Sequence, residues 1–146
     1  MRLRRPSFPV KRSGTGHNKM ARVLALDYGS ASCGCAISDP TGTLATPLDP
    51  VPDPASEGGI ARLAALVAEQ DAATVVVGVP VSLSGEEGPQ AAEARAFAGR
   101  LADRLDVPVE TFDERFTTRL ARTTPGRSSE HSRAAAHLLD SYLRAR

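Results

Sequence analysis

The stretch RVLALDYGSASCGCAIS, residues 22–38, decides the fold. Its first six residues are mostly apolar and indicate a buried strand that ends at Asp27. A three-residue turn follows, and Cys33–Ser38 indicates a second strand that returns beside the first. We therefore expect a β-hairpin here, with an acidic residue where its first strand ends.

The chain after this hairpin alternates between strand and helix patterns. Ser56 can cap a first helix, and Pro89 suits the first turn of a second one. The run TVVVGV is the most apolar and indicates a central strand covered on both faces. The elements expected after the hairpin are a strand Thr43–Leu48 at a sheet edge, a helix over about 57–70, a strand Thr74–Val79, a helix from Pro89 to about Leu105, a strand Val107–Phe112 and a helix Ser129–Leu143.

This order of elements predicts an α/β fold. Three meander strands followed by crossover units give a mixed five-stranded sheet with helices on both faces. A chain of 146 residues with 41% apolar composition fits one domain with one core. Cys33 and Cys35 are too close in sequence for an unstrained disulfide and too few for a zinc site, so we expect two reduced, buried thiols.

Charge is divided unevenly along the chain. Residues 1–20 carry six basic and no acidic side chains in a segment rich in Pro, Gly and Ser. We expect a disordered basic tail, or an upstream extension if Met20 is the true start; an arm that touches nucleic acid is the alternative. Residues 21–146 hold 12 basic and 17 acidic residues, a net charge of −5, so binding of nucleic acid requires a local site.

The sequence also limits the possible cellular locations of the protein. No apolar run approaches the roughly 20 residues needed to cross a bilayer, which excludes an integral membrane protein. No signal-peptide pattern is present, so we expect a cytoplasmic protein. The oligomeric state stays open, a homodimer included.

Acidic residues close two of the expected strands. Asp27 ends the first strand and Glu114 follows the fifth, and the carboxyl ends of parallel strands meet at one edge of a sheet. Two carboxylates there would supply the hard oxygen ligands that Mg²⁺ and Mn²⁺ prefer. The structural alternatives are that Asp27 caps its own turn, and that Arg115 forms a salt bridge with Asp113 or Glu114.

His131 is expected in the first turn of the last helix. Helical spacing places it on the apolar stripe and places His137 on the solvated face. The other members of that stripe are Ala134, Ala135, Leu138 and Tyr142. A helix N-terminus favours neutral imidazole, the form that binds metals, so His131 is a third candidate ligand. A histidine buried for packing alone is the alternative.

Two further segments lie near the same predicted edge. Thr117 and Thr118 are placed to cap the following turn or to donate hydrogen bonds to a phosphate. The polar loop Ser82–Gly88 leaves the central strand there; it either meets a substrate backbone or is a plain surface loop.

Five motifs in this order resemble the YqgF family, Holliday-junction-resolvase-like proteins described as nucleases for pre-16S rRNA. The resemblance runs from about residue 21 to residue 143. The motifs are LDYGS at 26–30, SDP at 38–40, VGVP at 77–80 with SG at 84–85 and GPQ at 88–90, DERFTT at 113–118, and AAA at 134–136 with Leu139, Tyr142 and Leu143.

The resemblance implies a ribonuclease-H-like fold and a metal site of three carboxylates. Asp27 and Glu114 match two of them, whereas His131 stands where the family usually has Asp. The expected activity is hydrolysis of phosphodiester bonds with Mg²⁺ or Mn²⁺ held by Asp27, Glu114 and His131, weakened by the histidine. The expected substrate contacts are Gly29, Arg115, Thr117 and Thr118.

The resemblance favours pre-rRNA as substrate and a role in ribosome biogenesis. Branched DNA, cut as by a junction resolvase, is the first alternative. A catalytically weak nucleic-acid-binding or ribosome-assembly module is the second, because of His131. The D-x-G motif at Asp27 also occurs in actin-like ATPases, but that fold needs two such halves and a much longer chain.

Overall fold

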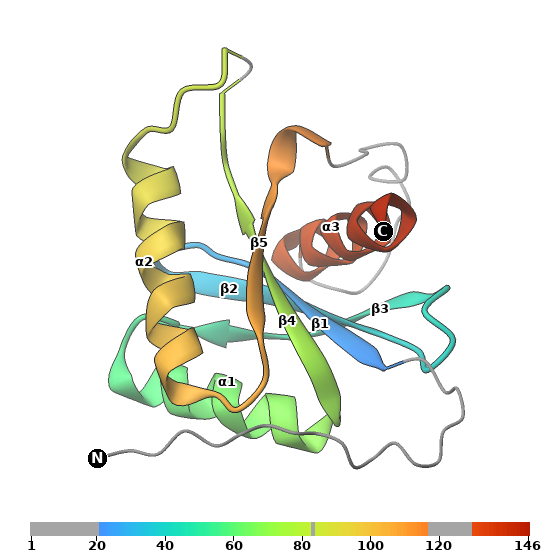
Figure 1. Cartoon of the computed structure of the whole chain (residues 1–146). Coiled ribbons are helices and arrows are strands. Elements are labelled where there is room, and N and C mark those ends of the chain that lie inside the picture. The colour runs from blue at the N-terminus through green and yellow to red at the C-terminus, as the bar shows by residue number, and fades with distance from the viewer. Residues whose placement is uncertain (1–20, 83, 117–129) are drawn as a thin grey trace.

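The computed structural model describes residues 21–82, 84–116 and 130–146, in which helices cover both faces of a sheet (Figure 1). The strands are β1 (Arg22–Asp27), β2 (Ser32–Ser38), β3 (Ala45–Pro52), β4 (Ala72–Val79) and β5 (Val109–Asp113). The helices are α1 (Glu57–Glu69), α2 (Pro89–Arg104), the short 3₁₀ helix η2 (Glu114–Phe116) and α3 (Glu130–Ala145). In this part of the chain no helix has both the length and the apolar character of a membrane span.

The sheet is mixed, as predicted. Its strand order is β3-β2-β1-β4-β5. β1 pairs antiparallel with β2, and β1, β4 and β5 run parallel to one another. The carboxyl ends of these three parallel strands therefore lie at one edge of the sheet, which is where open α/β sheets place their sites.

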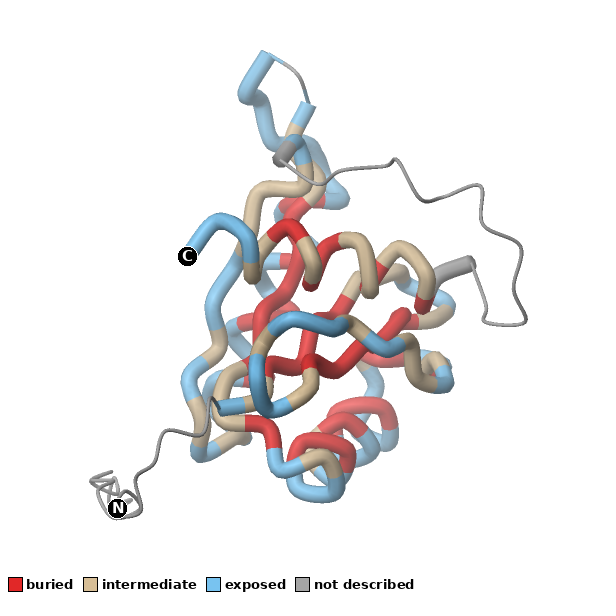
Figure 2. Tube along the Cα trace, turned by 90° about the vertical axis from the view of Figure 1, so that its right-hand side faces the viewer, coloured by how far each residue is buried: buried red, intermediate tan, exposed pale blue. Residues whose placement is uncertain are grey.

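The two faces of the sheet carry separate cores (Figure 2). Under α1 and α2 the core consists of large apolar side chains, including Leu24, Leu26, Leu63, Phe97 and Leu101. Under α3 the core is smaller, and its buried members are Val23, Ala25, Ala36, Val76, Ala135, Leu138 and Leu139. Both cysteines are free and buried on the first of these faces, as predicted.

Strand β3 differs from its prediction because the preceding turn is longer. Thr43 and Leu44 do not join the strand, since their amides donate to the carboxylate of Asp39 at 2.9 and 2.8 Å. β3 instead begins at Ala45 and continues to Pro52 at the edge of the sheet. Its prolines, which lack an N–H, are tolerated at an edge.

The helices follow the predicted pattern closely. Ser56 caps α1 as expected, because its Oγ accepts from the Gly59 amide at 2.9 Å. In α3 the predicted stripe is correct at Ala135 and Leu138, but Ser132 and Leu139 are also fully buried, whereas Ala134 is half-buried. The buried face of α3 is thus rotated slightly about the helix axis, toward Ser132 and Leu139, relative to the face that the sequence predicts.

Candidate active site

Asp27 and Glu114 lie on the same face of the sheet, under α3. Val23 and Ala25 of β1 belong to the core on that face, and side chains alternate along a strand, so Asp27 projects to it as well. Phe112 of β5 packs on the same core, and Glu114 follows it at the strand end. Both carboxylates are half-buried.

Gly78 of β4 lies between these two strand ends. Leu26 pairs with Val77, and Gly78 pairs with Phe112, so Gly78 is next to Asp27 on one side and to β5 on the other. The Glu114 side chain folds back over Gly78: a methyl group on Gly78 would lie only 2.6 Å from Glu114 Oε2. Because neighbouring strands are about 4.8 Å apart, this contact brings the Glu114 carboxylate close to Asp27.

Tyr28 and Cys33 lie near Asp27 on the opposite face of the sheet, under α1 and α2. The Tyr28 ring packs on Phe97 of α2 with 4.6 Å between centroids, which anchors the end of β1. The pKa of the Cys33 thiol is raised by a hydrogen bond with Cys35, by burial, by the charge of Cys35 and by the negative charge of Asp27.

Helix α3 is tied to the sheet beside Asp27. Ser132 is fully buried, and its Oγ accepts a hydrogen bond from the Cys35 amide at 3.3 Å. Gly34, the neighbour of Cys35, pairs with Asp27. The first turn of α3 therefore starts close to the Asp27 strand end.

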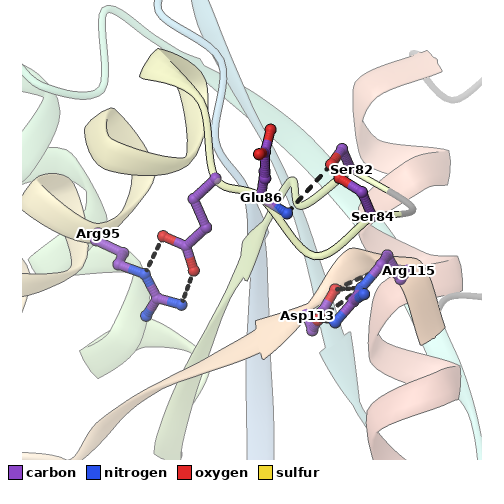
Figure 3. Close-up of polar contacts among 7 residues, drawn as sticks. Ser82, Ser84, Glu86, Arg95, Asp113 and Arg115 are labelled. Atoms are coloured by element: carbon purple, nitrogen blue, oxygen red, sulfur yellow. Dashed lines mark hydrogen bonds and ion pairs between the residues drawn. The ribbon is translucent and has the colours of Figure 1, made fainter.

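Arg115 forms an ion pair with Asp113, one of the structural alternatives that the sequence left open (Figure 3). Its Nη2 lies 2.7 Å from Asp113 Oδ2, and its Nε lies 3.0 Å from the same oxygen. The hydrogen bond to Arg115, with its positive charge, lowers the pKa of Asp113. Asp113 thereby fixes the direction of the guanidinium at the edge of the site.

The loop after β4 lies against this ion pair (Figure 3). It is closed by hydrogen bonds from the Ser82 amide to the Glu86 carbonyl at 3.1 Å and from the Gly85 amide to the Ser82 carbonyl at 2.9 Å. Gly85 has a φ of +92°, which favours glycine, and Arg115 Nη1 lies 3.6 Å from where its methyl group would be. Beyond the loop, Glu87 pairs with Arg95 of α2, with Nε 2.8 Å from Oε1.

The structure thus places two of the predicted ligands, Asp27 and Glu114, on one face at the same edge of the sheet. Other predicted site residues are not among the residues that it describes. Gly29 is half-buried in the loop after β1, and Arg115 lies at the same edge. Thr117, Thr118 and the side chain of His131 lie outside the described residues. Sequence reasoning missed the contact of Glu114 with Gly78; the only signal for Gly78 is a glycine inside the most apolar strand.

Two carboxylates that lie near each other repel unless a cation or a proton lies between them. Their oxygen atoms fit Mg²⁺ or Mn²⁺ in chemistry. Within the described residues, no three His, Cys, Asp or Glu side chains gather as a metal site, and the side chain of His131, the third predicted ligand, lies outside them.

The chain is similar to known proteins over most of its length. A family model described as "RuvX: Holliday junction resolvase" matches residues 21–145. A protein of Clavibacter michiganensis named "Putative pre-16S rRNA nuclease" is 42% identical over 123 residues, which cover 84% of this chain and 76% of that relative. A protein of Chloroflexus aggregans with the same name is 41% identical, covering 85% of this chain and 94% of the relative.

Solved structures show the same fold. RuvC of Thermus thermophilus, in complex with a Holliday junction substrate, matches 86% of this chain and 94% of its own with a TM-score of 0.61 and 15% identity. A second structure of Thermus thermophilus RuvC gives a TM-score of 0.57 at 19% identity, covering 85% of this chain and 95% of its own. The predicted ribonuclease-H-like architecture is therefore confirmed.

Proposed function

The chain belongs to the RuvX family of Holliday junction resolvases, and from this we propose that it is a metal-dependent nuclease that processes the end of pre-16S rRNA in ribosome biogenesis. The observation that carries the proposal is the Glu114 side chain folded over Gly78 toward Asp27. Relatives at 41–42% identity are named as pre-16S rRNA nucleases, which supports RNA as the substrate.

Asp27, Glu114 and His131 hold the cation in this proposal. The first two come from the ends of β1 and β5, on either side of β4, and the third from the turn of α3 that Ser132 ties beside them. When bound, the cation supplies a nucleophile near neutral pH and stabilises the charge that develops at phosphorus. The carboxylates hold it at the strand edge, and their mutual repulsion is relieved by its charge.

Gly29, Arg115, Thr117 and Thr118 contact the phosphate backbone of the substrate. Gly29 allows a backbone to approach closely, since it has no side chain. Arg115 presents a guanidinium that Asp113 holds in direction, and a planar guanidinium suits phosphate oxygens. Because residues 21–146 have a net charge of −5, these local contacts have to offset the repulsion of an anionic substrate.

The test is cleavage of an RNA that carries the precursor extension of 16S rRNA, with Mg²⁺, Mn²⁺ or EDTA. We expect cleavage with metal and none with EDTA, and a loss of at least about 100-fold for Asp27→Asn, because several kcal/mol of metal-derived stabilisation disappear. Asp39→Asn is the matched control, since Asp39 serves only its own turn, and it should cleave like the wild type.

Holliday junction DNA is the second candidate substrate, because the family is described as Holliday junction resolvases. A four-way DNA junction and the RNA are therefore offered in parallel. Cleavage of the junction alone would replace RNA by DNA as the substrate. Binding without cleavage, unchanged in Asp27→Asn, would overturn the enzyme proposal in favour of a binding module.

His131 sets the metal preference in this proposal. Imidazole suits Mn²⁺ better than Mg²⁺, and its neutral ring removes one negative charge from the usual carboxylate set. We expect a low rate with Mg²⁺ and a higher one with Mn²⁺. His131→Asp should raise the Mg²⁺-supported rate by about tenfold, the equivalent of roughly 1.4 kcal/mol. Equal rates for His131→Ala and wild type with both metals would remove His131 from the site.

A further inference from the structure

Gly78 lies at the proposed site without a functional group of its own, and its surroundings explain why. It belongs to β4, the strand between Asp27 and Glu114. Val76 packs under α3, so a side chain at 78 would project to that same face. The space that it would fill is the space between the two carboxylates and α3.

That space is already occupied. A methyl group at Gly78 would lie 2.6 Å from Oε2 of Glu114, 3.1 Å from its Cγ and 3.0 Å from Cδ2 of Leu138. Favourable contacts between such atoms need about 3.5 Å or more. Leu138 is 2% exposed and packed in the core under α3, whereas the half-buried Glu114 has room to swing away at the open edge. A side chain at 78 would therefore displace the Glu114 carboxylate.

Backbone conformation does not account for the glycine. Among the described residues, the glycines with positive φ are Gly42 and Gly85, and Gly78 is a strand residue of β4 that pairs with Phe112 of β5. Glycine inside a strand weakens it, because it has no side chain to pack and loses more entropy on folding. Glycine is therefore required at position 78 for steric reasons.

We infer that Gly78 is a positioning residue: its missing side chain forms the slot that holds the Glu114 carboxylate over the sheet beside Asp27. This inference rests on the proposed function for its consequence, which is metal binding. Gly78 touches no substrate itself. It acts through Glu114, and its replacement lowers the affinity for the cation while every ligand stays in the sequence.

The first experiment measures Mn²⁺ binding to the substrate-free protein by electron paramagnetic resonance. Gly78→Ala should weaken binding about 10–100-fold, the usual effect of losing a group that orients a metal ligand. Gly99→Ala in α2 is the matched control, because a methyl group there meets no atom within 4 Å. It should bind Mn²⁺ like the wild type. Wild-type affinity in Gly78→Ala would overturn the inference.

The second experiment needs no metal and compares stability in urea. Gly78→Ala should destabilise the wild-type background more than a Glu114→Ala background, because the second lacks the side chain that the methyl group meets. The inference also holds if the single variant fails to fold and the double variant folds. An equal loss in both backgrounds, or failure of both to fold, would assign the clash to Leu138 and overturn the inference.

The two experiments separate this inference from the proposed function. A wild type that neither binds Mn²⁺ nor cleaves RNA or DNA contradicts the proposed function, and the stability comparison then decides whether Gly78 forms the slot for Glu114. A wild type that binds Mn²⁺ and cleaves, together with an unaffected Gly78→Ala, contradicts the inference alone.

Discussion

The two faces of the sheet differ in what their residues do. The face under α1 and α2 is filled by large apolar side chains, and its two cysteines are buried with them. The face under α3 has smaller apolar residues, and it carries Ser132, Asp27 and Glu114. The difference indicates that one face provides most of the hydrophobic stability, while the other accepts buried polar groups and like charges near its open edge.

The largest expected effect on stability lies on the apolar face. Leu63→Ala in α1 removes a fully buried side chain far from the strand edge. It should lower the free energy of unfolding by about 2–5 kcal/mol, through lost burial and the cavity that remains. Urea unfolding measures this, and the specific nuclease activity of the folded variant should be unchanged. A large loss of activity per folded molecule would show that the two faces are not separate in function.

Two serines, Ser132 in α3 and Ser56 at the start of α1, allow a sharper comparison of the same two faces. Ser132→Ala leaves the buried Cys35 amide without this acceptor and should cost about 1–3 kcal/mol. It should also weaken Mn²⁺ binding, because the first turn of α3 loses its tie to β2. Ser56→Ala, at the exposed cap of α1, should cost about 1 kcal/mol and leave Mn²⁺ binding unchanged. Equal effects of the two variants on Mn²⁺ binding would contradict the comparison.

Asp39 is a structural aspartate, in contrast to Asp27, the proposed metal ligand. Its carboxylate accepts hydrogen bonds from the Thr41 hydroxyl and from the amides of Leu44, Thr43 and Thr41, and these lower its pKa. The stability that they contribute is present above the ordinary Asp pKa of about 4 and is lost as the pH falls through the lower pKa of the folded state.

Asp39→Asn should therefore flatten the acid side of the stability curve. Measured by urea unfolding between pH 2 and pH 7, the wild type should lose its advantage over the variant below about pH 4. Above about pH 5 the difference between them should be constant. An advantage that grows on acidification would contradict the assignment of these hydrogen bonds to the ionised carboxylate.

The smallest effect is expected outside the sheet altogether. We propose that residues 21–146 form the nuclease domain and residues 1–20 a basic tail, because the tail has no pattern that could build a core. Deletion of residues 1–19 should leave the melting temperature unchanged in calorimetry. A drop of several degrees would mean that the segment packs on the domain.

Much of this fold follows from the sequence alone. The apolar runs of β1 and β4, the cap at Ser56 and the first turn at Pro89 predict their elements almost to the residue. β3 was predicted to begin at Thr43 because a pattern of residues does not reveal that Asp39 captures the amides of Thr43 and Leu44. β5 starts at Val109 rather than Val107, after Pro108, which has no N–H to donate.

The candidate site is predictable only in part. Asp27 and Glu114 stand out because a carboxylate at the end of an apolar strand is unusual. The contact of Glu114 with Gly78 depends on how β4 and β5 pair, and residues about 36 positions apart leave no local pattern for it. The Asp113–Arg115 ion pair was foreseen as an alternative, yet its place beside the loop after β4 requires the folded chain.

The central claim is that Asp27 and Glu114 share one cation. Mn²⁺ titration of the substrate-free protein, followed by electron paramagnetic resonance, tests it in the wild type, Asp27→Asn, Glu114→Gln and the double variant. Each single change should weaken the binding of one Mn²⁺ ion at least about tenfold, and the double variant should bind it at least as weakly as the weaker-binding single variant, because both carboxylates ligate the same ion. Wild-type affinity in either single variant, or two separate Mn²⁺ sites of which each single change removes only one, would contradict the claim.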